Sequence, residues 1–224
     1  MPESPNESAE YRRLRAQLLD AEIELKEGRE RVAELRRKLP IDTPVNEYCF
    51  VEGPLDLTSR DETREKKGLA ELFANPHVPL VLMQFMFGGA QEKPCPMCTM
   101  WADGYDALAP HIRQRANLAV LVAGEVEPFR AYARERGWSR LRILSASESS
   151  VKRDLGFEDA DGAQHPGVSV FVQRDGTLLH SVSVCALMAD EEFRGMDLLC
   201  PTWHFFDLLP DGRGDWFPST RYEP

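Results

Sequence analysis

The sequence lacks several features that would place it at once in a large class of proteins. No stretch approaches the ~20 consecutive apolar residues that a membrane-spanning helix needs. The opening residues, MPESPNESAEYRRLRAQ, are polar and lack the apolar segment of a secretory signal peptide. Basic side chains are in deficit, with 27 lysines and arginines against 37 aspartates and glutamates, which disfavours binding to phosphate backbones. We therefore expect a cytoplasmic protein with neither a membrane nor a nucleic acid as its partner.

Cysteine is also scarce, with five residues in a chain of 224: Cys49, Cys95, Cys98, Cys185 and Cys200. An odd number of mostly scattered cysteines in a reducing compartment does not suit a framework of structural disulfides. Isolated cysteines are usually small buried residues, which leaves the role of Cys49 unassigned. Cys185 and Cys200 either share that role, form a second pair, or exchange electrons with the first pair. The CxxC spacing of Cys95 and Cys98 is what carries a functional prediction.

What the sequence does contain is enough apolar side chain for a core, with 42% hydrophobic residues. Residues 1–8 are expected to be disordered. Residues 9–39 are expected to form a charged helix, in which apolar or small residues recur at alternating spacings of four and three: Leu14, Leu18, Ala21, Leu25, Gly28, Val32, Leu35 and Leu39. This heptad seam packs either on a domain or on its own copy in a homodimer. We thus predict an arm over 1–44 and a globular domain over 45–224.

Strand and helix patterns alternate along the globular part. Residues 45–58 read as a hairpin around a Gly-Pro turn, and 61–75 as a short helix. The apolar run 78–87 predicts a strand buried on both faces, and the CxxC then opens a helix of about 18 residues. The elements expected after that helix are strands at 117–122 and 141–144, helices at 125–136, 147–155 and near 190–195, and a strand hairpin over 168–184.

This order of elements predicts the fold class. Helices between successive strands favour an α/β sandwich, with a central mixed sheet flanked by helices. The sheet should be parallel in its first part and end in an antiparallel hairpin at one edge, because Arg174-Asp175-Gly176 is a short turn signal. The fold we expect is thioredoxin-like, with the N-terminal helix as an extension.

The CxxC motif has the local signature of a redox-active dithiol. Pro96 suits the first position of a helix, where its missing N–H costs nothing, so Cys95 becomes the N-cap. The Cys95 sulfur then faces unpaired backbone N–H groups and the positive end of the helix dipole, which lowers its pKa below the free value of about 8.5. Cys98 lies one turn on and more buried. An exposed thiolate that attacks and a covered thiol that resolves are what thiol–disulfide exchange needs.

Two other interpretations of the CxxC motif remain open. The pair could supply half of a zinc site, but such a site needs about four ligands and no second CxxC or HxxxH follows. The cysteines could also be inert. The strand–CxxC–helix context within a βαβ pattern favours the redox interpretation, which requires neither a metal nor a cofactor.

Several segments together resemble one family. Residues 85–88 (FMFG), 95–103 (CPMCTMWAD) and 167–171 (GVSVF), with the late segment WHFFDLLPDGR, are similar to the DUF899 family over about residues 9 to 215. Members are uncharacterised bacterial proteins, classed as thioredoxin-like and predicted to be dithiol–disulfide oxidoreductases. The resemblance implies the same fold and activity here. The middle of the chain, including VKRDLG and FVQRDG, is also similar to peroxiredoxins.

The sequence departs from the patterns of both related groups. Peroxiredoxins carry Thr or Ser three residues before the reactive cysteine, where this chain has Glu92, and Pro94 directly precedes Cys95. Thioredoxins carry a cis-proline before the strand that faces the dithiol. In the present sequence the nearest candidate is Pro166, which lies about two residues away from the position of the thioredoxin proline. Val168 is then the residue expected to face the dithiol, which would alter the docking of a peptide substrate.

The residues around the dithiol are candidate site neighbours: Pro96, Met97, Trp101, Asp103 and Val168. Trp101 lies one turn past Cys98 and either covers the dithiol or simply packs in the core. Asp103 either relays protons to Cys98, if buried, or is an ordinary exposed helix residue.

The predicted function is therefore that of an enzyme acting on disulfides. Cys95 attacks a disulfide-bearing protein or a small thiol substrate, and Cys98 resolves the mixed disulfide. One alternative is a non-catalytic thioredoxin-like module that binds a partner through the N-terminal helix or the aromatic tail. Another is a peroxidase with a non-standard site, which the missing Thr or Ser disfavours.

Overall fold

A computed structural model describes residues 7–186, 200–210, 212 and 214–222 of the chain. It divides into two compact units, residues 1–40 and 41–224. In the described part, no helix is both long and apolar enough to span a membrane. The helix predicted near 190–195 lies outside the described residues. The elements are α1 Ala9–Lys38, β1 Thr43–Pro44, β2 Cys49–Glu52, β3 Glu65–Gly68, the 3₁₀ helix η1 Leu69–Leu72, β4 Leu80–Gln84, α2 Pro96–Ile112, β5 Asn117–Val122, α3 Val126–Arg136, β6 Ile143–Ser145, α4 Val151–Asp154, β7 Gly167–Arg174, β8 Thr177–Cys185 and α5 Thr202–Phe206.

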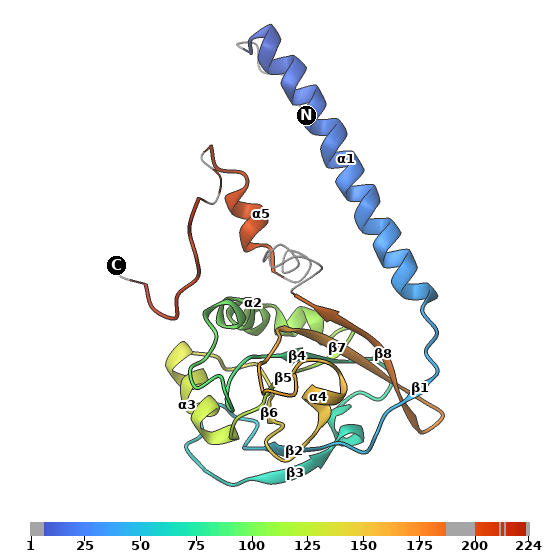
Figure 1. Cartoon of the computed structure of the whole chain (residues 1–224), viewed down its shortest axis with the longest axis vertical. Helices are drawn as coiled ribbons and strands as arrows, with labels where there is room; N and C mark the ends of the chain where they lie inside the picture. The colour runs from blue at the N-terminus through green and yellow to red at the C-terminus, as the bar shows by residue number, and fades with distance from the viewer. Residues whose placement is uncertain (1–6, 187–199, 211, 213, 223–224) are drawn as a thin grey trace. The chain divides into compact units, whose positions relative to one another are not determined.

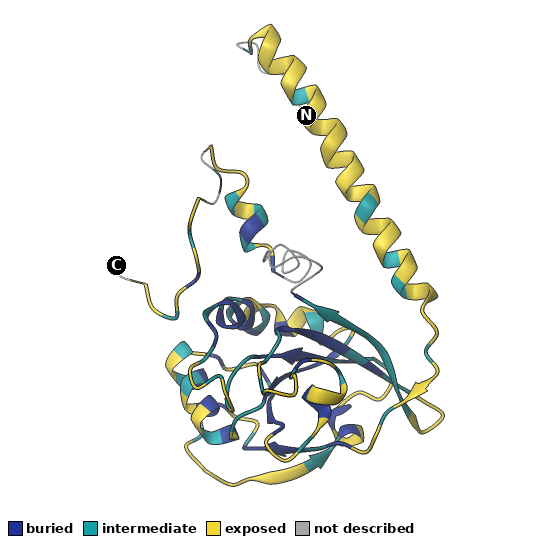
Figure 2. Cartoon of the chain, in the orientation of Figure 1, coloured by how far each residue is buried: buried dark blue, intermediate teal, exposed yellow. Residues whose placement is uncertain are grey.

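The first unit is the single helix α1, close to its predicted bounds. Ser8 is the N-cap, and its side chain accepts a hydrogen bond from the Tyr11 N–H at 3.1 Å. Three basic residues in the last turn suit the negative end of the helix dipole. None of the residues of α1 is buried, and Figure 2 shows the helix exposed along its length. Most of the predicted disordered tail lies outside the described residues.

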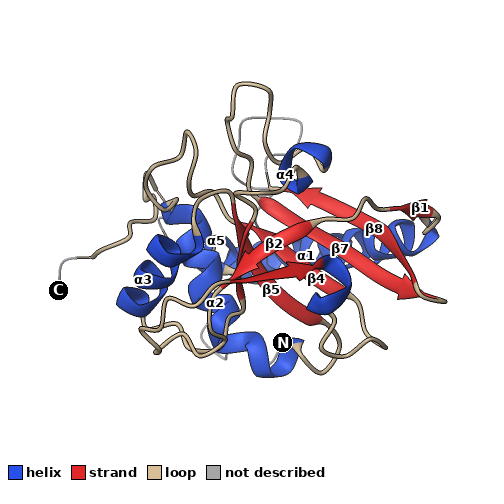
Figure 3. Cartoon of the chain, turned by 90° about the horizontal axis from the view of Figure 1, so that it is seen from below, coloured by secondary structure: helices blue, strands red, loops and turns tan. Residues whose placement is uncertain are grey.

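The second unit is built on one mixed sheet of eight strands, in the order β1-β8-β7-β4-β5-β6-β2-β3. Strands β4, β5 and β6 are parallel, and the β7–β8 hairpin lies antiparallel on the other side of β4. Figures 1 and 3 show helices on both sides of these strands. The parallel strands, crossover helices and antiparallel hairpin confirm the predicted thioredoxin-like α/β fold.

Two predictions before β4 are wrong. Residues 45–58 do not form a hairpin, because β2 pairs with β3 and with β6 instead. The Gly-Pro turn starts an irregular loop that Arg130 holds, since its guanidinium donates to the carbonyls of Pro54 and Asp56. Residues 61–75 contain β3 and η1 rather than a helix. The Glu71 carboxylate accepts the Gly68 N–H at 2.7 Å, which fixes the change from strand to 3₁₀ turn.

The later elements follow the predictions closely, with one shorter helix. Helix α3 ends at Gly137, whose φ of 76° is the left-handed conformation of a helix C-cap. Helix α4 covers only part of the predicted range 147–155, and its N-cap is Ser150. The Ser145 hydroxyl accepts a hydrogen bond from the Ser147 N–H at 3.1 Å, so Ser147 belongs to the turn before the helix.

Two apolar clusters cover the two faces of the sheet. One holds Met83 of β4 and Phe85, which directly follows β4, with side chains of α2 and α3. The other holds Leu80 and Leu82 of β4 with η1 and Val151 of α4. Figure 2 shows β4 and β5 buried between these layers. As successive strand residues point to opposite faces, the carboxyl end of β4 is reached from one side by α2 and from the other by α4.

Candidate functional site

The dithiol sits where β4 is followed by α2, with the predicted helix-start geometry. Cys95 is the N-cap and Pro96 occupies the first turn, which confirms both predictions. The Cys95 sulfur accepts the backbone N–H of Cys98 at 3.5 Å, within the range for sulfur acceptors. The Cys95 carbonyl accepts the Thr99 N–H at 2.9 Å and closes the first turn of the helix.

The loop that delivers Cys95 is tied to the end of β4. The Cys95 N–H donates to the Met86 carbonyl at 3.2 Å. Gly88 and Gln91 exchange backbone hydrogen bonds of 2.7 and 3.0 Å across a short turn. The Gln164 side-chain amide donates to the Gly88 carbonyl at 2.6 Å. These bonds hold the start of α2 against the sheet and so set the position of the two sulfur atoms.

The two thiols differ in burial and in acidity. Cys95 has 6% of its surface exposed and Cys98 none. The pKa of Cys95 is lowered to about 7, chiefly because the Cys98 thiol donates a hydrogen bond to its sulfur, with backbone N–H groups of Cys98 and Met97 adding to the effect. The pKa of Cys98 is raised, first by burial and then by the neighbouring Cys95 thiolate. The arrangement gives one nucleophilic sulfur and one held as a thiol.

We expect this difference to be visible in the pH dependence of alkylation. A lowered pKa means that the Cys95 thiolate predominates above pH 7 and is lost as the pH falls through about 7. The rate of Cys95 modification by iodoacetamide, followed by peptide mass mapping, should inflect near that pH. In Cys98→Ala the inflection should move up, because the main hydrogen-bond donor is gone. The same inflection in both proteins would contradict this origin of the shift.

A buried lysine lies at the same end of β4, and sequence reasoning missed it. Lys152 of α4 is 1% exposed. Its ammonium donates to the Phe85 carbonyl at 3.3 Å and to the Gln84 side-chain oxygen at 3.4 Å. Burial lowers its pKa to about 8, opposed by the charge of Cys98. Nothing in the segment SSVKRDLG distinguishes this lysine from an exposed one, because its burial results from how α4 packs.

Gln84 links Lys152 to a chain of hydrogen bonds that leads away from the dithiol. Its side-chain N–H donates to the Ser169 hydroxyl at 3.2 Å, which fixes the amide so that its oxygen faces Lys152. Ser169 in turn bonds Ser183 at 3.0 Å, and Ser183 bonds the His180 ring at 2.9 Å. Burial lowers the pKa of His180. The chain of hydrogen bonds across β4, β7 and β8 thus anchors the lysine's partner.

The predicted site neighbours divide into two groups. Met97 and Trp101 are buried in the same apolar cluster as Cys95 and Cys98, and Pro96 is half-buried beside them. Asp103 turns elsewhere: its carboxylate pairs with Arg136 at 2.5 Å and accepts the Trp138 indole N–H at 2.8 Å. These bonds attach α2 to α3 and occupy the carboxylate that would have relayed protons to Cys98.

The residue expected opposite the dithiol lies inside β7. Val168 is buried and pairs with Met83 of β4 and Val184 of β8. Within the described residues no peptide bond is cis, so Pro166 is trans. Gly167 precedes Val168 where a side chain would collide with the Val184 carbonyl and the Phe157 ring, at 2.3 and 2.5 Å. The approach to this part of the sheet is therefore filled by Phe157 and β8.

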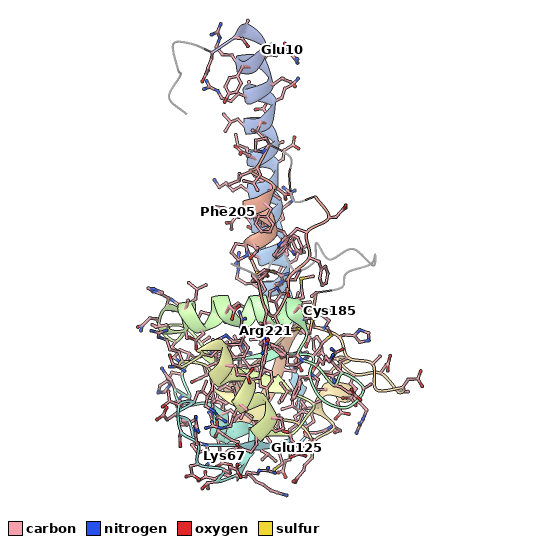
Figure 4. The ribbon with its side chains drawn as sticks, turned by 90° about the vertical axis from the view of Figure 1, so that its left-hand side faces the viewer. Glu10, Lys67, Glu125, Cys185, Phe205 and Arg221 are labelled. Atoms are coloured by element: carbon pink, nitrogen blue, oxygen red, sulfur yellow. The ribbon has the colours of Figure 1, made fainter. Side chains whose placement is uncertain are left out.

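The other three cysteines are spread over the domain. Cys49 begins β2 and Cys185, labelled in Figure 4, ends β8; both are partly exposed. Cys200 is buried, bonds the Thr202 hydroxyl at 3.3 Å and influences the pKa of Tyr105 in α2. All five cysteines are free thiols in this structure. Among the described residues, no three His, Cys, Asp or Glu side chains gather in a group able to hold a metal ion.

Fold and site together define a class: an α/β protein of thioredoxin-like fold that carries two close cysteines at a helix start. The chain belongs to the DUF899 family, described as bacterial protein of unknown function, whose profile matches residues 1–222. This confirms the resemblance that the sequence motifs indicate. No curated protein matches the sequence. The family assignment therefore brings no established activity with it.

Similar solved structures are distant. PrxQ of Xylella fastidiosa, solved as a mutant, is 10% identical and has a TM-score of 0.47, covering 72% of this chain and 93% of that chain. AhpC of Mycobacterium tuberculosis is 17% identical, with a TM-score of 0.45 and coverages of 72% and 93%. The mitochondrial 2-Cys peroxiredoxin of Plasmodium falciparum is 10% identical, with a TM-score of 0.47 and coverages of 80% and 100%. At these values no function passes to the present chain.

Proposed function

We propose that this protein is a thiol–disulfide oxidoreductase in which Cys95 attacks and Cys98 resolves. The observation that carries the proposal is the asymmetry of the pair: Cys95 caps α2, keeps 6% of its surface exposed and has the lowered pKa, whereas Cys98 is fully buried and its pKa is raised. A catalytic dithiol needs this asymmetry, because one thiol must meet the substrate and the other must wait.

The reaction takes place in two displacements. The Cys95 thiolate attacks one sulfur of a substrate disulfide, so that the substrate S–S bond breaks, a mixed disulfide forms and the first substrate sulfur leaves as a thiolate. Cys98 then attacks the Cys95 sulfur, forming the Cys95–Cys98 disulfide and releasing the second substrate sulfur. The proton that Cys98 loses is taken up by one of the two released thiolates. Two electrons pass from protein to substrate, and a cellular thiol or dithiol would restore the reduced pair.

The proposed substrate is a disulfide in a protein or the oxidised, disulfide form of a small thiol. The test is a single turnover of the fully reduced protein with a small aromatic disulfide, followed by mass mapping of all five thiols. One substrate disulfide should be reduced per chain, with a new bond only between Cys95 and Cys98. A pair that stays reduced toward every disulfide tried would defeat the proposal and leave a non-catalytic binding module. Consumption of hydrogen peroxide much faster than by free cysteine would favour the peroxidase instead.

We further propose that α1 pairs with the α1 of a second copy. The seam residues Leu18 and Leu25 are 55% and 52% exposed, and a heptad spacing lets each seam residue meet its equivalent in another chain. Analytical ultracentrifugation of the full chain should show a dimer. Leu18→Glu with Leu25→Glu should shift it to monomer, since charges would face each other in the seam. The matched control is Leu19→Glu with Ile23→Glu, which lie off the seam; equal loss of dimer in both proteins would contradict the pairing.

A further inference from the structure

One peptide group joins the buried lysine to the buried thiol. The Phe85 carbonyl accepts the Lys152 ammonium at 3.3 Å. The N–H of the next residue, Met86, acts on the Cys98 sulfur and lowers its pKa, and the same residue ties the start of α2 by accepting the Cys95 N–H at 3.2 Å. The Phe85 carbonyl and the Met86 N–H belong to the same planar peptide group and point in opposite directions. Lys152 and Cys98 therefore approach the end of β4 from opposite sides, in keeping with their positions in α4 and α2.

Burial of the charged Lys152 side chain costs free energy, and neither hydrogen-bond partner of its ammonium carries an opposite charge. Both partners are neutral oxygens, from Gln84 and Phe85, in a place where the side chain is 1% exposed. Burying an ammonium without a close counter-ion costs several kcal/mol, and an apolar side chain of similar length would pack there at lower cost. A buried cation beside a reactive thiol is the kind of group that a functional site retains.

We propose that Lys152 is a positioning residue for the resolving thiol: its ammonium, acting across the Phe85–Met86 peptide group, stabilises the Cys98 thiolate that closes the disulfide. A cation at the carbonyl polarises the peptide and makes its N–H a stronger donor. The field of the ammonium adds to this effect, because little water screens it inside the protein. The proposal rests on the dithiol function and assigns a residue to its second step.

The stabilisation matters most after the first displacement. In the reduced protein the Cys95 thiolate accepts a hydrogen bond from the Cys98 thiol and repels a second negative charge, and both effects keep Cys98 protonated. In the mixed disulfide the Cys95 sulfur is neutral. It therefore no longer accepts a strong hydrogen bond from the Cys98 thiol, and it no longer repels a negative charge on Cys98. Burial is then opposed by the Met86 N–H and by Lys152. The Cys98 thiolate should thus become accessible at the moment when it is needed.

The first measurement is the acidity of Cys98 with Cys95 removed. In Cys95→Ala, NMR of cysteine labelled at ¹³Cβ follows each thiol separately through a pH titration. The Cys98 pKa in Lys152→Met should lie about one unit above that in Lys152→Arg, which corresponds to a tenfold smaller thiolate fraction. Arginine is the reference because its charge persists through the titration, whereas Lys152, with a pKa of about 8, loses its charge before Cys98 ionises. The titratable groups that act on this pair are Cys95, which is absent here, and Glu158 beside Lys152.

The second measurement separates the two displacements in the protein with both cysteines. In Lys152→Met, attack by Cys95 should keep its rate, while closure of the mixed disulfide should slow about tenfold at pH 7. A merely structural role would change both steps. The matched control is Lys66→Met, which removes an exposed cation paired with Glu148; neither residue acts on Lys152 or Cys98. This control should leave both steps and the Cys98 pKa as they are.

The outcomes decide between the two proposals. A folded Lys152→Met protein with the Cys98 pKa of Lys152→Arg and the wild-type closure rate would overturn the role of Lys152. If Lys152→Met does not fold, Lys152→Gln repeats the comparison with a donor that carries no charge. Wild-type protein that reduces no disulfide would defeat the dithiol function. The NMR comparison would still show whether the lysine and the thiol are coupled, so the two failures are distinguishable.

Discussion

Replacement of Cys95 by serine is expected to remove all measurable disulfide reduction by this protein. A serine hydroxyl does not ionise near pH 7, whereas the pKa of Cys95 is about 7, so about half of its sulfur is nucleophilic there. We expect a loss of at least ~10³-fold, since a side chain that makes the first covalent bond has no substitute in the site. Cys98 cannot take over, because it has no exposed surface. The measurement is release of a coloured thiol from an aromatic disulfide by the reduced protein.

The matched variant is Cys98→Ser, which should fail one step later. Cys95 remains able to attack, so a stable mixed disulfide should accumulate at one substrate sulfur per chain and be visible by intact mass. Substitution of Cys49 or Cys185 should leave the single turnover as it is in the wild type. If Cys95→Ser retained the wild-type rate, or if the mixed disulfide formed at another cysteine, the assignment of the attacking thiol would be wrong.

The parts of this site that could be predicted are those governed by neighbouring residues. A proline after Cys95 and a buried strand before it are enough to place the first thiol at an N-cap. The acidity difference follows from that placement, because the spacing lets the Cys98 thiol donate to the Cys95 sulfur, the helix start adds N–H groups, and the turn covers Cys98. The alternation of strands and helices from β4 to β8 is similarly local and follows the apolar pattern.

The parts that could not be predicted depend on distant contacts. The segment EKKG of β3 has no apolar alternation and forms a strand because β2 lies beside it. Lys152 is an ordinary basic residue in the sequence, and its burial depends on where α4 meets the end of β4. The Asp103 carboxylate bonds to Arg136 and Trp138, both more than thirty residues away along the chain. Such partners become apparent only when the sheet is assembled.

Replacement of Gly88 by alanine is expected to cause the largest loss of stability among single methyl additions near the site. Gly88 has a φ of 90°, and its missing Cβ would lie 2.0 Å from the Gly124 Cα and 2.1 Å from the Gly124 nitrogen. Both atoms are backbone, so no side chain can turn away to make room. Collision and left-handed strain together should cost about 3–5 kcal/mol of unfolding free energy. Urea denaturation with an unchanged slope measures the loss.

The adjacent Gly89→Ala provides the matched control, because it isolates the strain from the collision. Gly89 has a φ of 58°, but the nearest atom to its Cβ would be the Gln164 amide nitrogen at 4.0 Å. This variant should lose only about 1–2 kcal/mol, the cost of a left-handed alanine. Gly88→Ala should also displace the turn that Gly88 forms with Gln91 and move the Cys95 inflection away from pH 7, whereas Gly89→Ala should not. Equal losses in the two variants would mean that contact between Gly88 and Gly124 does not hold the dithiol loop in place.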